Sequence, residues 1–288
     1  MTVGMLHPGS MGAAVAGQLR GRGADVLWHT AGRSAASAVR AAAAGLEGVD
    51  DLGVLVKRAD VVISLCPPAA AESVAESVAA HGFAGKLYVE VNAITPQRLG
   101  RIAEILPDSL VIDAVVIGSP PGGGKRPRLY VAGEPEPVAT MEGLFAGTHV
   151  EIRSLGRELG RASALKLAYS SYQKASRVLA ALSFGLAEEY GVGDELLDVA
   201  GKRPGSYLVE TGYIPKTASR AWRWGPEMEG AAELFREAGL LAEVMQAVAE
   251  VLVRWDGDRD QELSIEGALS GLRTGSPGES LRCQGKEQ

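Results

Sequence analysis

Regular alternation of strand-like and helix-like segments over the first 155 residues is the feature that most constrains this fold. The strand-like segments are short and apolar, such as "TVGML" at the start and "DVVISLC" at residues 60–66. Helix-like segments separate them, for example "SMGAAVAGQLRGRG" after the first strand. Near-continuous apolar strands that alternate with helices predict a parallel sheet covered by helices on both faces.

After residue 155 the pattern changes to helices only. Residues 159–191, "LGRASALKLAYSSYQKASRVLAALSFGLAEEYG", predict a single helix of about 30 residues. We therefore expect an α/β fold with an N-terminal domain over 1–155 and an all-α domain over 156–268. The polar, Gly/Ser-rich residues 269–288 predict a flexible tail. The long helix carries Ala and Leu on several faces, which predicts a homodimer that packs through the helical domains.

Composition narrows the functional class. The net charge of −6 over 288 residues argues against a nucleic-acid-binding protein, which needs basic patches. No apolar run reaches the roughly 18 to 20 residues that cross a bilayer, and no leader precedes the first strand, so we expect a cytoplasmic protein without membrane contact. Cys66 and Cys283 give no disulfide framework, and four scattered histidines give no metal-ligand spacing.

The loop after the first strand, in "VGMLHPGSMG", has the shape of a dinucleotide-binding turn. A G-x-G-x-x-G turn uses its first glycine for the bend, its second for close approach of the diphosphate, and its third for helix packing. Here His7, Gly9 and Gly12 hold these positions, so the two later glycines are kept. The loop opens a helix whose N-terminus can bind phosphate. We therefore predict cofactor contacts from the whole loop, which comprises His7, Pro8, Gly9, Ser10, Met11 and Gly12.

The end of the second strand, "VLWHTAGRS", indicates which nicotinamide cofactor binds. An NAD site usually has Asp or Glu here to bind the ribose 2′-hydroxyl, and residues 28–34 contain neither. Thr30, Arg33 and Ser34 are instead suited to a 2′-phosphate, which accepts charge-assisted hydrogen bonds. The sequence therefore favours NADPH over NADH.

Five segments together resemble the β-hydroxyacid dehydrogenase and 6-phosphogluconate dehydrogenase-like superfamily. They are "VGMLHPGSMGAAVA", "VVISLCPP", "VEVNAITP", "IDAVVIG" and "GRASALKLAYSS", in the order and spacing of that superfamily. The later "AWRWGPEMEGAAELFREAGL" resembles the helical domain of a branch that often has "HPG" in the loop. The resemblance implies a Rossmann NAD(P)-binding domain followed by a helical domain, in an architecture related to imine reductases.

Further site residues follow from this resemblance alone. Two segments that follow strands would border the cofactor, with Leu65, Cys66, Pro67, Asn92 and Ile94 as its contacts. The stretch "DAVVIGS" would contact substrate through Ile117, Gly118 and Ser119. Ile117 stands where relatives have a carboxylate-binding serine, and Tyr169 and Ser170 stand where relatives have asparagines. Lys166 matches the catalytic lysine.

The helix around Lys166 supports such a role from its spacing alone. Ser170, Gln173 and Arg177 fall on the same side of the helix as Lys166, with Tyr169 and Lys174 beside them. A polar stripe on an otherwise apolar helix is suited to lining a cleft. We predict that Ser170 and Gln173 orient the substrate. In the last part of the chain, Trp222, Arg223 and Met228 are further candidates for substrate contact.

The leading hypothesis is an NADPH-dependent oxidoreductase that moves hydride between the nicotinamide and a small hydroxy/keto substrate, with Lys166 as general acid and base. Burial would lower the pKa of this lysine from about 10.4 toward working pH. One alternative is an imine reductase that acts on C=N bonds. Another is a sensor or scaffold that binds NADPH without turnover. Cys66 is interpreted as a small buried residue, and the basic loop at 119–128 as solvated surface.

Overall fold

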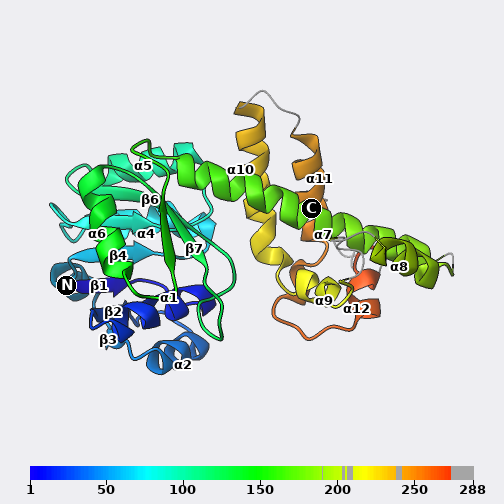
Figure 1. Ribbon diagram of the computed structural model, residues 1–288, viewed down its shortest axis with the longest axis horizontal. Coiled ribbons are helices and arrows are strands. Elements are labelled where there is room, and N and C mark those ends of the chain that lie inside the picture. Colours follow the sequence, from blue (N-terminus) through cyan, green and yellow to red (C-terminus); the bar gives the residue numbers. More distant parts are fainter. Residues whose placement is uncertain (190, 203–204, 206–209, 238–241, 274–288) are drawn as a thin grey trace, which may run out of the picture. The chain divides into compact units, whose positions relative to one another are not determined.

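The computed structural model describes residues 1–189, 191–202, 205, 210–237 and 242–273. The chain divides into two compact units, Met1–Leu167 and Ala168–Gln288, and Figure 1 follows the chain through both. The division falls later than the predicted boundary after residue 155, because the first turns of the long helix are hydrogen-bonded to the sheet. None of the described helices is both long enough and apolar enough to span a membrane.

The first unit, called the α/β unit below, is built on one eight-stranded sheet in the order β3-β2-β1-β4-β5-β6-β7-β8. The predicted parallel sheet is confirmed, except that β7 runs antiparallel to β6. This reversal follows from the short Gly/Pro-rich connection between them, which has no crossover helix. The strands are β1 (Thr2–Met5), β2 (Asp25–His29), β3 (Glu47–Val49), β4 (Val61–Ser64), β5 (Leu87–Glu90), β6 (Leu110–Ile117), β7 (Arg128–Ala132) and β8 (Glu151–Ser154).

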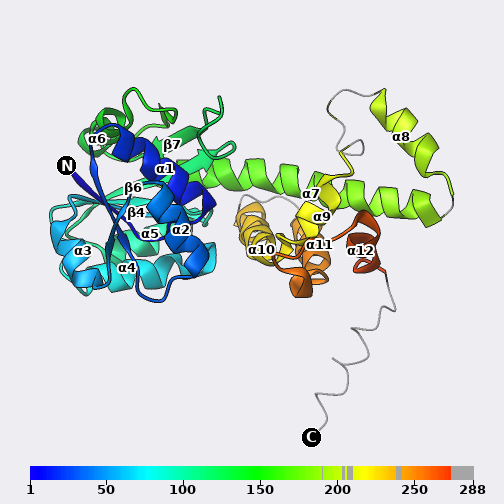
Figure 2. The same cartoon turned by 90° about the horizontal axis from the view of Figure 1, so that it is seen from below.

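Helices cover both faces of this sheet, as the two views in Figures 1 and 2 show. Along β2, β4 and β5 successive side chains alternate between two separate apolar cores, and Val61 and Val62 are one such pair. The first core includes side chains of α1, α2 and α6, and the second includes side chains of α3, α4 and α5. Their bounds are α1 (Ser10–Gly21), α2 (Ala35–Ala43), α3 (Leu52–Arg58), α4 (Ala71–Ala79), α5 (Pro96–Ile105) and α6 (Pro135–Phe145).

Three of these helices begin at residues whose side chains cap the free backbone N–H groups of the first turn. Ser34 accepts from Ser37 N at the start of α2, Asp51 caps α3 in the same way, and Thr95 caps α5. Such caps stabilise a helix by about 1 kcal/mol each. They also set where each strand-to-helix loop ends, and so place the loops that carry the predicted cofactor contacts.

The second unit, called the helical unit below, is all-α within its described residues. Its bounds are α7 (Arg161–Glu189, which begins in the α/β unit), α8 (Gly193–Gly201), α9 (Tyr213–Ala218), α10 (Ala221–Glu237), α11 (Glu243–Val253) and α12 (Ile265–Ser270). The predicted long helix corresponds to α7. The core of the helical unit contains Trp224, Met245 and Trp255, and the indole of Trp255 donates to the Ala268 carbonyl at 2.7 Å.

One helix of the helical unit contains a proline, and one predicted limit differs from the structure. Pro226 lies inside α10, which starts at Ala221. A proline so near a helix start removes only one intrahelical hydrogen bond, which buried neighbours such as Trp224 offset. The tail was expected from residue 269, yet Leu269 and Leu272 pack against the helical core. Residues 274–288 of the predicted tail lie outside the described residues.

Candidate functional site

The carboxyl ends of β1, β2, β4, β5 and β6 all lie at one edge of the sheet, because these strands are parallel in register. In the sheet, β1 lies between β2 and β4, so the strand order reverses at β1. Ligands of open α/β sheets bind outside the carboxyl ends of the strands, where the strand order reverses. The loops that follow these five strands are therefore the candidate site.

The loop between β1 and α1 is shaped by its two glycines for different reasons. A Cβ on Gly12 would lie 2.5 Å from the His7 carbonyl oxygen, so only glycine lets α1 pack against the loop. A Cβ on Gly9 would meet nothing within 4 Å. No atom of the described residues therefore requires a glycine at position 9. The open space beside Gly9 is what a loop needs if a ligand is to approach its backbone closely. No side chain caps α1, so its first N–H groups are available to a phosphate.

His7 and Arg33 meet beside this loop and carry unsatisfied polar atoms. Burial, with the nearby charges of Arg33 and His29, lowers the pKa of His7 to about 4, so its imidazole is neutral at physiological pH. In the described part of the chain, His7 Nδ1 and Arg33 Nε are buried without a hydrogen-bond partner. Buried polar atoms are normally satisfied. These two atoms, together with the open space at Gly9, fit a site completed by a polar ligand such as a dinucleotide.

The corner between β2 and α2 brings together more polar groups than the sequence indicated. Ser34 Oγ lies 3.2 Å from Ser37 Oγ, and Arg40 Nη2 donates to Ser37 Oγ at 3.1 Å. Arg40 Nε also donates to the carbonyl of Pro8 at 3.2 Å. The sequence pattern did not indicate Ser37 and Arg40, because they lie beyond the end of β2, inside α2. Their i, i+3 spacing after Ser34, which places all three on one helix face, was the available signal.

A buried polar network lies under the ends of β4 and β5. Asn92 Oδ1 accepts from Cys66 N at 2.7 Å, and its Nδ2 lies within hydrogen-bond distance of Ser64, Cys66 and Glu90. The side chain of Asn92 is therefore engaged inside the protein, where it ties the loop after β4 to the end of β5. A direct contact from this side chain to the cofactor stays a prediction.

Two members of this network have strongly shifted pKa values. Burial raises the pKa of Glu90 to about 8, against the opposing effect of hydrogen bonds from Asn92 and Ser64. Burial and the neighbouring Glu90 raise the pKa of the Cys66 thiol to about 12, so Cys66 is a buried thiol and not a thiolate nucleophile. Glu90 was missed by sequence reasoning, because a carboxyl at a strand end gives no sign of full burial.

The other predicted contacts in these loops differ in exposure. Ile94 is buried in the core beneath α5, and Leu65 packs partly against the core of the opposite face. Pro67 is exposed, and so are Gly118 and Ser119 after β6. Ile117 is half-buried at the end of β6. Gly118 has a φ of +127°, and a Cβ there would lie 3.1 Å from Pro127, which explains why glycine begins this reversal.

Lys166 lies at the same edge of the sheet, held by an anchor at the start of α7. Asp113 on β6 accepts from Gly160 N, Ala162 N and Ser163 N at 2.9 to 3.1 Å, and from Ser163 Oγ at 2.7 Å. This buried carboxyl caps α7 and fixes its first turns to the sheet. Lys166 Nζ then donates to the Val116 carbonyl at 2.9 Å, next to Ile117.

The remaining predicted substrate contacts belong to the helical unit. Gln173 Nε2 lies 3.2 Å from Tyr169 Oη, and Ser170 is buried. Met228 is fully buried in the helical core, so it packs there and offers no surface to a substrate. The Trp222 ring lies under the guanidinium of Arg259, at 4.0 Å. Arg223 is exposed.

One residue of α7 differs from what the helix spacing suggested. Tyr172 on this helix is 71% exposed. Lys174, expected beside the polar stripe, is buried in an ion pair with Glu227 of α10, and its Nζ lies 5.3 Å from the centre of the Trp224 ring. The charged groups of α7 are thus partly committed to packing against α10.

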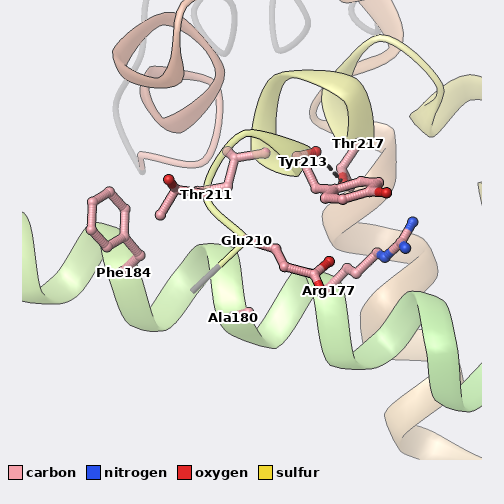
Figure 3. A pocket seen from close by; sticks show the side chains of 8 residues that line it. Arg177, Ala180, Phe184, Glu210, Thr211, Tyr213 and Thr217 are labelled. Carbon is pink, nitrogen blue, oxygen red and sulfur yellow. Dashed lines mark hydrogen bonds between the residues drawn. The ribbon is translucent and has the colours of Figure 1, made fainter. Parts of the chain in front are cut away.

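A cavity in the helical unit is too small for a substrate. Its volume is about 10 Å³, which is near that needed for one water molecule. Figure 3 shows the residues around it, with Arg177 stacked on the Tyr213 ring at 4.4 Å and Thr217 Oγ1 donating to the Tyr213 carbonyl. Among the described residues, no group of three or more His, Cys, Asp or Glu side chains is placed to hold a metal ion.

Comparison with known proteins agrees with this geometry. Residues 2–152 match the NAD binding domain of 6-phosphogluconate dehydrogenase, and residues 187–255 match a domain of unknown function, DUF1932. An uncharacterized 28.5 kDa protein of Methanothermus fervidus is 27% identical over 179 residues, which are 62% of this chain and 68% of that protein.

Two solved structures share the fold over most of the chain. A 3-hydroxyisobutyrate dehydrogenase of Mycobacterium tuberculosis has a TM-score of 0.74 at 20% identity, covering 95% of this chain and 99% of that one. A reductive aminase of Aspergillus terreus, solved with NADPH and ethyl levulinate, has a TM-score of 0.59 at 21% identity, covering 94% and 98%. With the matched domain spanning more than half of its residues, the chain belongs to the family of the NAD binding domain of 6-phosphogluconate dehydrogenase and is an NAD(P)-dependent oxidoreductase.

Proposed function

We propose that this protein is an NADPH-dependent oxidoreductase that transfers hydride between the nicotinamide and a small hydroxy/keto substrate. The observation that carries this proposal is the position of Lys166. Its ammonium is held 2.9 Å from the Val116 carbonyl at the carboxyl edge of the sheet, on a helix anchored by Asp113. The resemblance of the fold to a 3-hydroxyisobutyrate dehydrogenase supports the choice of substrate class.

Lys166 would supply the proton that balances the hydride. A bound nicotinamide cofactor supplies or accepts the hydride at the reacting carbon. In reduction, the ammonium of Lys166 gives its proton to the carbonyl oxygen as that oxygen gains charge. In oxidation, neutral Lys166 takes the hydroxyl proton while the carbon loses hydride. The Val116 carbonyl orients the amino group, and the anchor at Asp113 keeps α7 from shifting relative to β6.

The residues at the end of β6, next to Lys166, form what we call the substrate wall: Ile117, Gly118 and Ser119. This wall favours a substrate whose head group is polar rather than strongly anionic. Ile117, half-buried, places an apolar side chain at the end of β6, where a carboxylate would find no hydroxyl donor from this position. The neighbouring Gly118 and Ser119 are exposed and offer backbone groups and one hydroxyl. Aldehydes, ketones and neutral keto compounds fit this wall better than a simple 3-hydroxy acid.

Replacement of Lys166 by Met tests the proposal. We expect Lys166→Met to lower kcat for carbonyl reduction by about 100-fold or more, the usual effect of removing a general acid, while NADPH affinity stays within about threefold. The assay follows NADPH oxidation with a panel of keto acids, aldehydes and ketones. Lys57→Met, on the exposed side of α3, is the matched control. Undiminished turnover by Lys166→Met would contradict the role of Lys166.

An imine reductase is the second candidate, and two observations favour it. Ile117 places an apolar side chain at the end of β6, where the resemblance implies a serine in relatives, and the fold is shared with a reductive aminase solved with NADPH. Cyclic imines belong in the same panel. Turnover of imines but not of carbonyls would select this candidate. NADPH binding without turnover of any compound would favour a sensor or scaffold.

We also propose that the helical unit pairs with a second copy of the chain. The unit exposes several large apolar side chains, among them Tyr172 at 71% and Val199 at 58%. Packing against a second copy would remove such apolar surface from water. Light scattering after size exclusion should give a dimer mass at micromolar concentration, and a monomer mass would contradict the proposal.

A further inference from the structure

Arg40 joins the loop after β1 to the N-terminus of α2. Its Nε donates to the Pro8 carbonyl at 3.2 Å, and its Nη2 donates to Ser37 Oγ at 3.1 Å. Ser37 Oγ in turn lies 3.2 Å from Ser34 Oγ. The dinucleotide-binding pattern assigns nothing to this position. The contacts nevertheless place a guanidinium between the proposed diphosphate loop and the proposed 2′-phosphate corner.

The end of Arg40 that contacts the loop is firmly fixed. Pro8 is buried and its φ is restricted by its ring. Gly9 N donates to the His7 carbonyl at 2.8 Å, and Gly12 packs directly under that carbonyl. Because Nε is held by this rigid loop, the rest of the guanidinium is directed toward Ser37. The loop therefore positions Arg40 beside the corner.

Among the described residues, the arginines of this corner are not held in ion pairs, and the acidic side chains that act on the neighbouring His29 are those of Asp51 and Asp50. In the described part of the chain, neither Arg33 nor Arg40 forms an ion pair with a carboxylate, whereas Arg98 and Arg101 share Glu72. Arg33 Nε is buried without a hydrogen-bond partner. A guanidinium has five N–H donors, and Arg40 uses two in the bonds described above. The positive end of the α2 dipole lies at Ser34.

The Arg40 guanidinium, the hydroxyls of Ser34 and Ser37 and the N-terminus of α2 form a group rich in donors, and Arg33 directly precedes Ser34 in the chain. Such a group suits a phosphate monoester dianion, because each of its oxygens accepts hydrogen bonds and its charge is shared between two cations. A ribose 2′-hydroxyl is neutral, so it can accept a hydrogen bond from an arginine but gains none of the charge–charge attraction that a phosphate gains. The corner therefore discriminates between the two nicotinamide cofactors by charge.

We propose that Arg40 is a second cationic contact for the 2′-phosphate of NADPH and that it sets the preference over NADH together with Arg33. This inference rests on the proposed function, an NADPH-dependent oxidoreductase, and on the sequence-based prediction that Thr30, Arg33 and Ser34 contact the 2′-phosphate. It adds a specificity residue that approaches from α2, positioned by the Pro8 carbonyl and by Ser37.

Binding titrations with three ligands test the inference without any turnover. NADPH contacts both the corner and the loop, NADH lacks the 2′-phosphate, and 2′-AMP lacks the diphosphate. We expect Arg40→Met to raise the Kd for NADPH and for 2′-AMP by about 10-fold or more, the effect of losing a charge-assisted hydrogen bond. The Kd for NADH should change by less than about threefold, since a neutral ribose loses no such bond. Fluorescence of the intact protein gives all three constants.

Two further variants keep the test decisive. Arg40→Lys retains the charge and one donor, so its effect on NADPH should be smaller than that of Arg40→Met. Ser37→Ala removes the hydroxyl that positions Nη2 and should also weaken NADPH more than NADH. Arg20→Met, which removes an exposed arginine paired with Asp25 at the other end of α1, is the control. Thermal unfolding shows whether each variant is folded, and Arg40→Lys replaces Arg40→Met if the latter is not.

Three results would overturn the inference. Equal weakening of NADPH and NADH by Arg40→Met would make Arg40 only a brace for the loop. Unchanged NADPH affinity would exclude any contact, and the proposed function would still stand on wild-type binding. If the wild-type protein binds neither NADPH nor NADH, the proposed function itself fails and the role of Arg40 fails with it.

Discussion

The α/β unit buries the carboxyls of Glu90 and Asp113 among neutral hydrogen-bond donors, whereas the helical unit buries the carboxylate of Glu227 against the ammonium of Lys174. Asp113 receives three backbone N–H groups and a hydroxyl, and Glu90 receives the backbone and amide N–H groups of Asn92. Glu227 and Lys174 have only 13% and 8% of their side chains exposed. The same problem, a carboxyl taken out of water, is solved in two ways.

The two solutions differ in what they do for the molecule. Neutral donors from the backbone fix one chain segment to another, so Asp113 sets where α7 starts and Glu90 sets the orientation of Asn92. An ion pair fixes only two side chains and adds a dehydration penalty that its attraction must offset. We therefore expect the helical unit to be sensitive to loss of one charge, and the α/β unit to be sensitive to pH.

Loss of one partner of the ion pair should give the largest effect. Lys174→Met leaves the Glu227 carboxylate buried without its cation, and this should cost about 3 to 5 kcal/mol of unfolding free energy. Urea unfolding followed by circular dichroism measures the change. The matched control is Lys202→Met, which breaks an exposed i, i+4 pair with Asp198, where 71% and 65% of the two side chains are exposed. That variant should lose no more than about 0.5 kcal/mol.

The double variant Lys174→Met/Glu227→Met sharpens this result. With both charges removed, neither member of the pair is left without its counter-charge, and the apolar side chains can pack beside Trp224. We expect the double variant to recover most of the stability lost by Lys174→Met, since buried pairs replaced by apolar residues are often neutral or stabilising. Equal losses from the double and the single variant would show that packing volume, and not charge, dominates at this position.

The order of strands and helices could be predicted from the sequence more reliably than the directions of strands and side chains. Apolar strands such as Val61–Ser64 predict a buried sheet, and the helices between the strands predict that the strands are parallel. The antiparallel direction of β7 was not predicted, because a strand of five residues, Arg128–Ala132, reads the same in either direction. Only the length and the Gly/Pro content of the preceding loop indicate it, and they do so after the sheet order is known.

The candidate site shows the same limit at the level of single residues. Lys166 was placed by motif spacing, and the structure brings it to the carboxyl edge of the sheet. Asn92 was placed at the right strand end, but its side chain lies inside the buried network, and a sequence pattern does not specify a rotamer. The pair of Lys174 and Glu227 joins residues 53 positions apart, on α7 and α10. Such a contact depends on how two helices pack and is absent from any local spacing.

The pH dependence of stability should separate the α/β unit from the helical unit. The pKa of Glu90 is about 8 in the folded protein and has an ordinary value of 4.5. Below pH 4.5 the carboxyl is protonated in both the folded and the unfolded chain, and its contribution to stability is fully present. As pH rises from 4.5 to 8, the unfolded chain releases the proton and the folded chain keeps it. Stability is therefore lost in this window, by about 1.4 kcal/mol per pH unit at most.

Glu90→Gln should remove this loss, because glutamine imitates the protonated carboxyl at every pH. We expect the variant to match the wild type near pH 4.5 and to unfold at a progressively higher temperature than the wild type as pH approaches 8. Differential scanning calorimetry from pH 4.5 to 8.5 measures the gap, and Glu104→Gln, on the exposed side of α5, should show none. A gap that stays constant with pH would mean that Glu90 is ionised in the folded state, and the α/β unit would then carry an unpaired buried charge where the helical unit has a paired one.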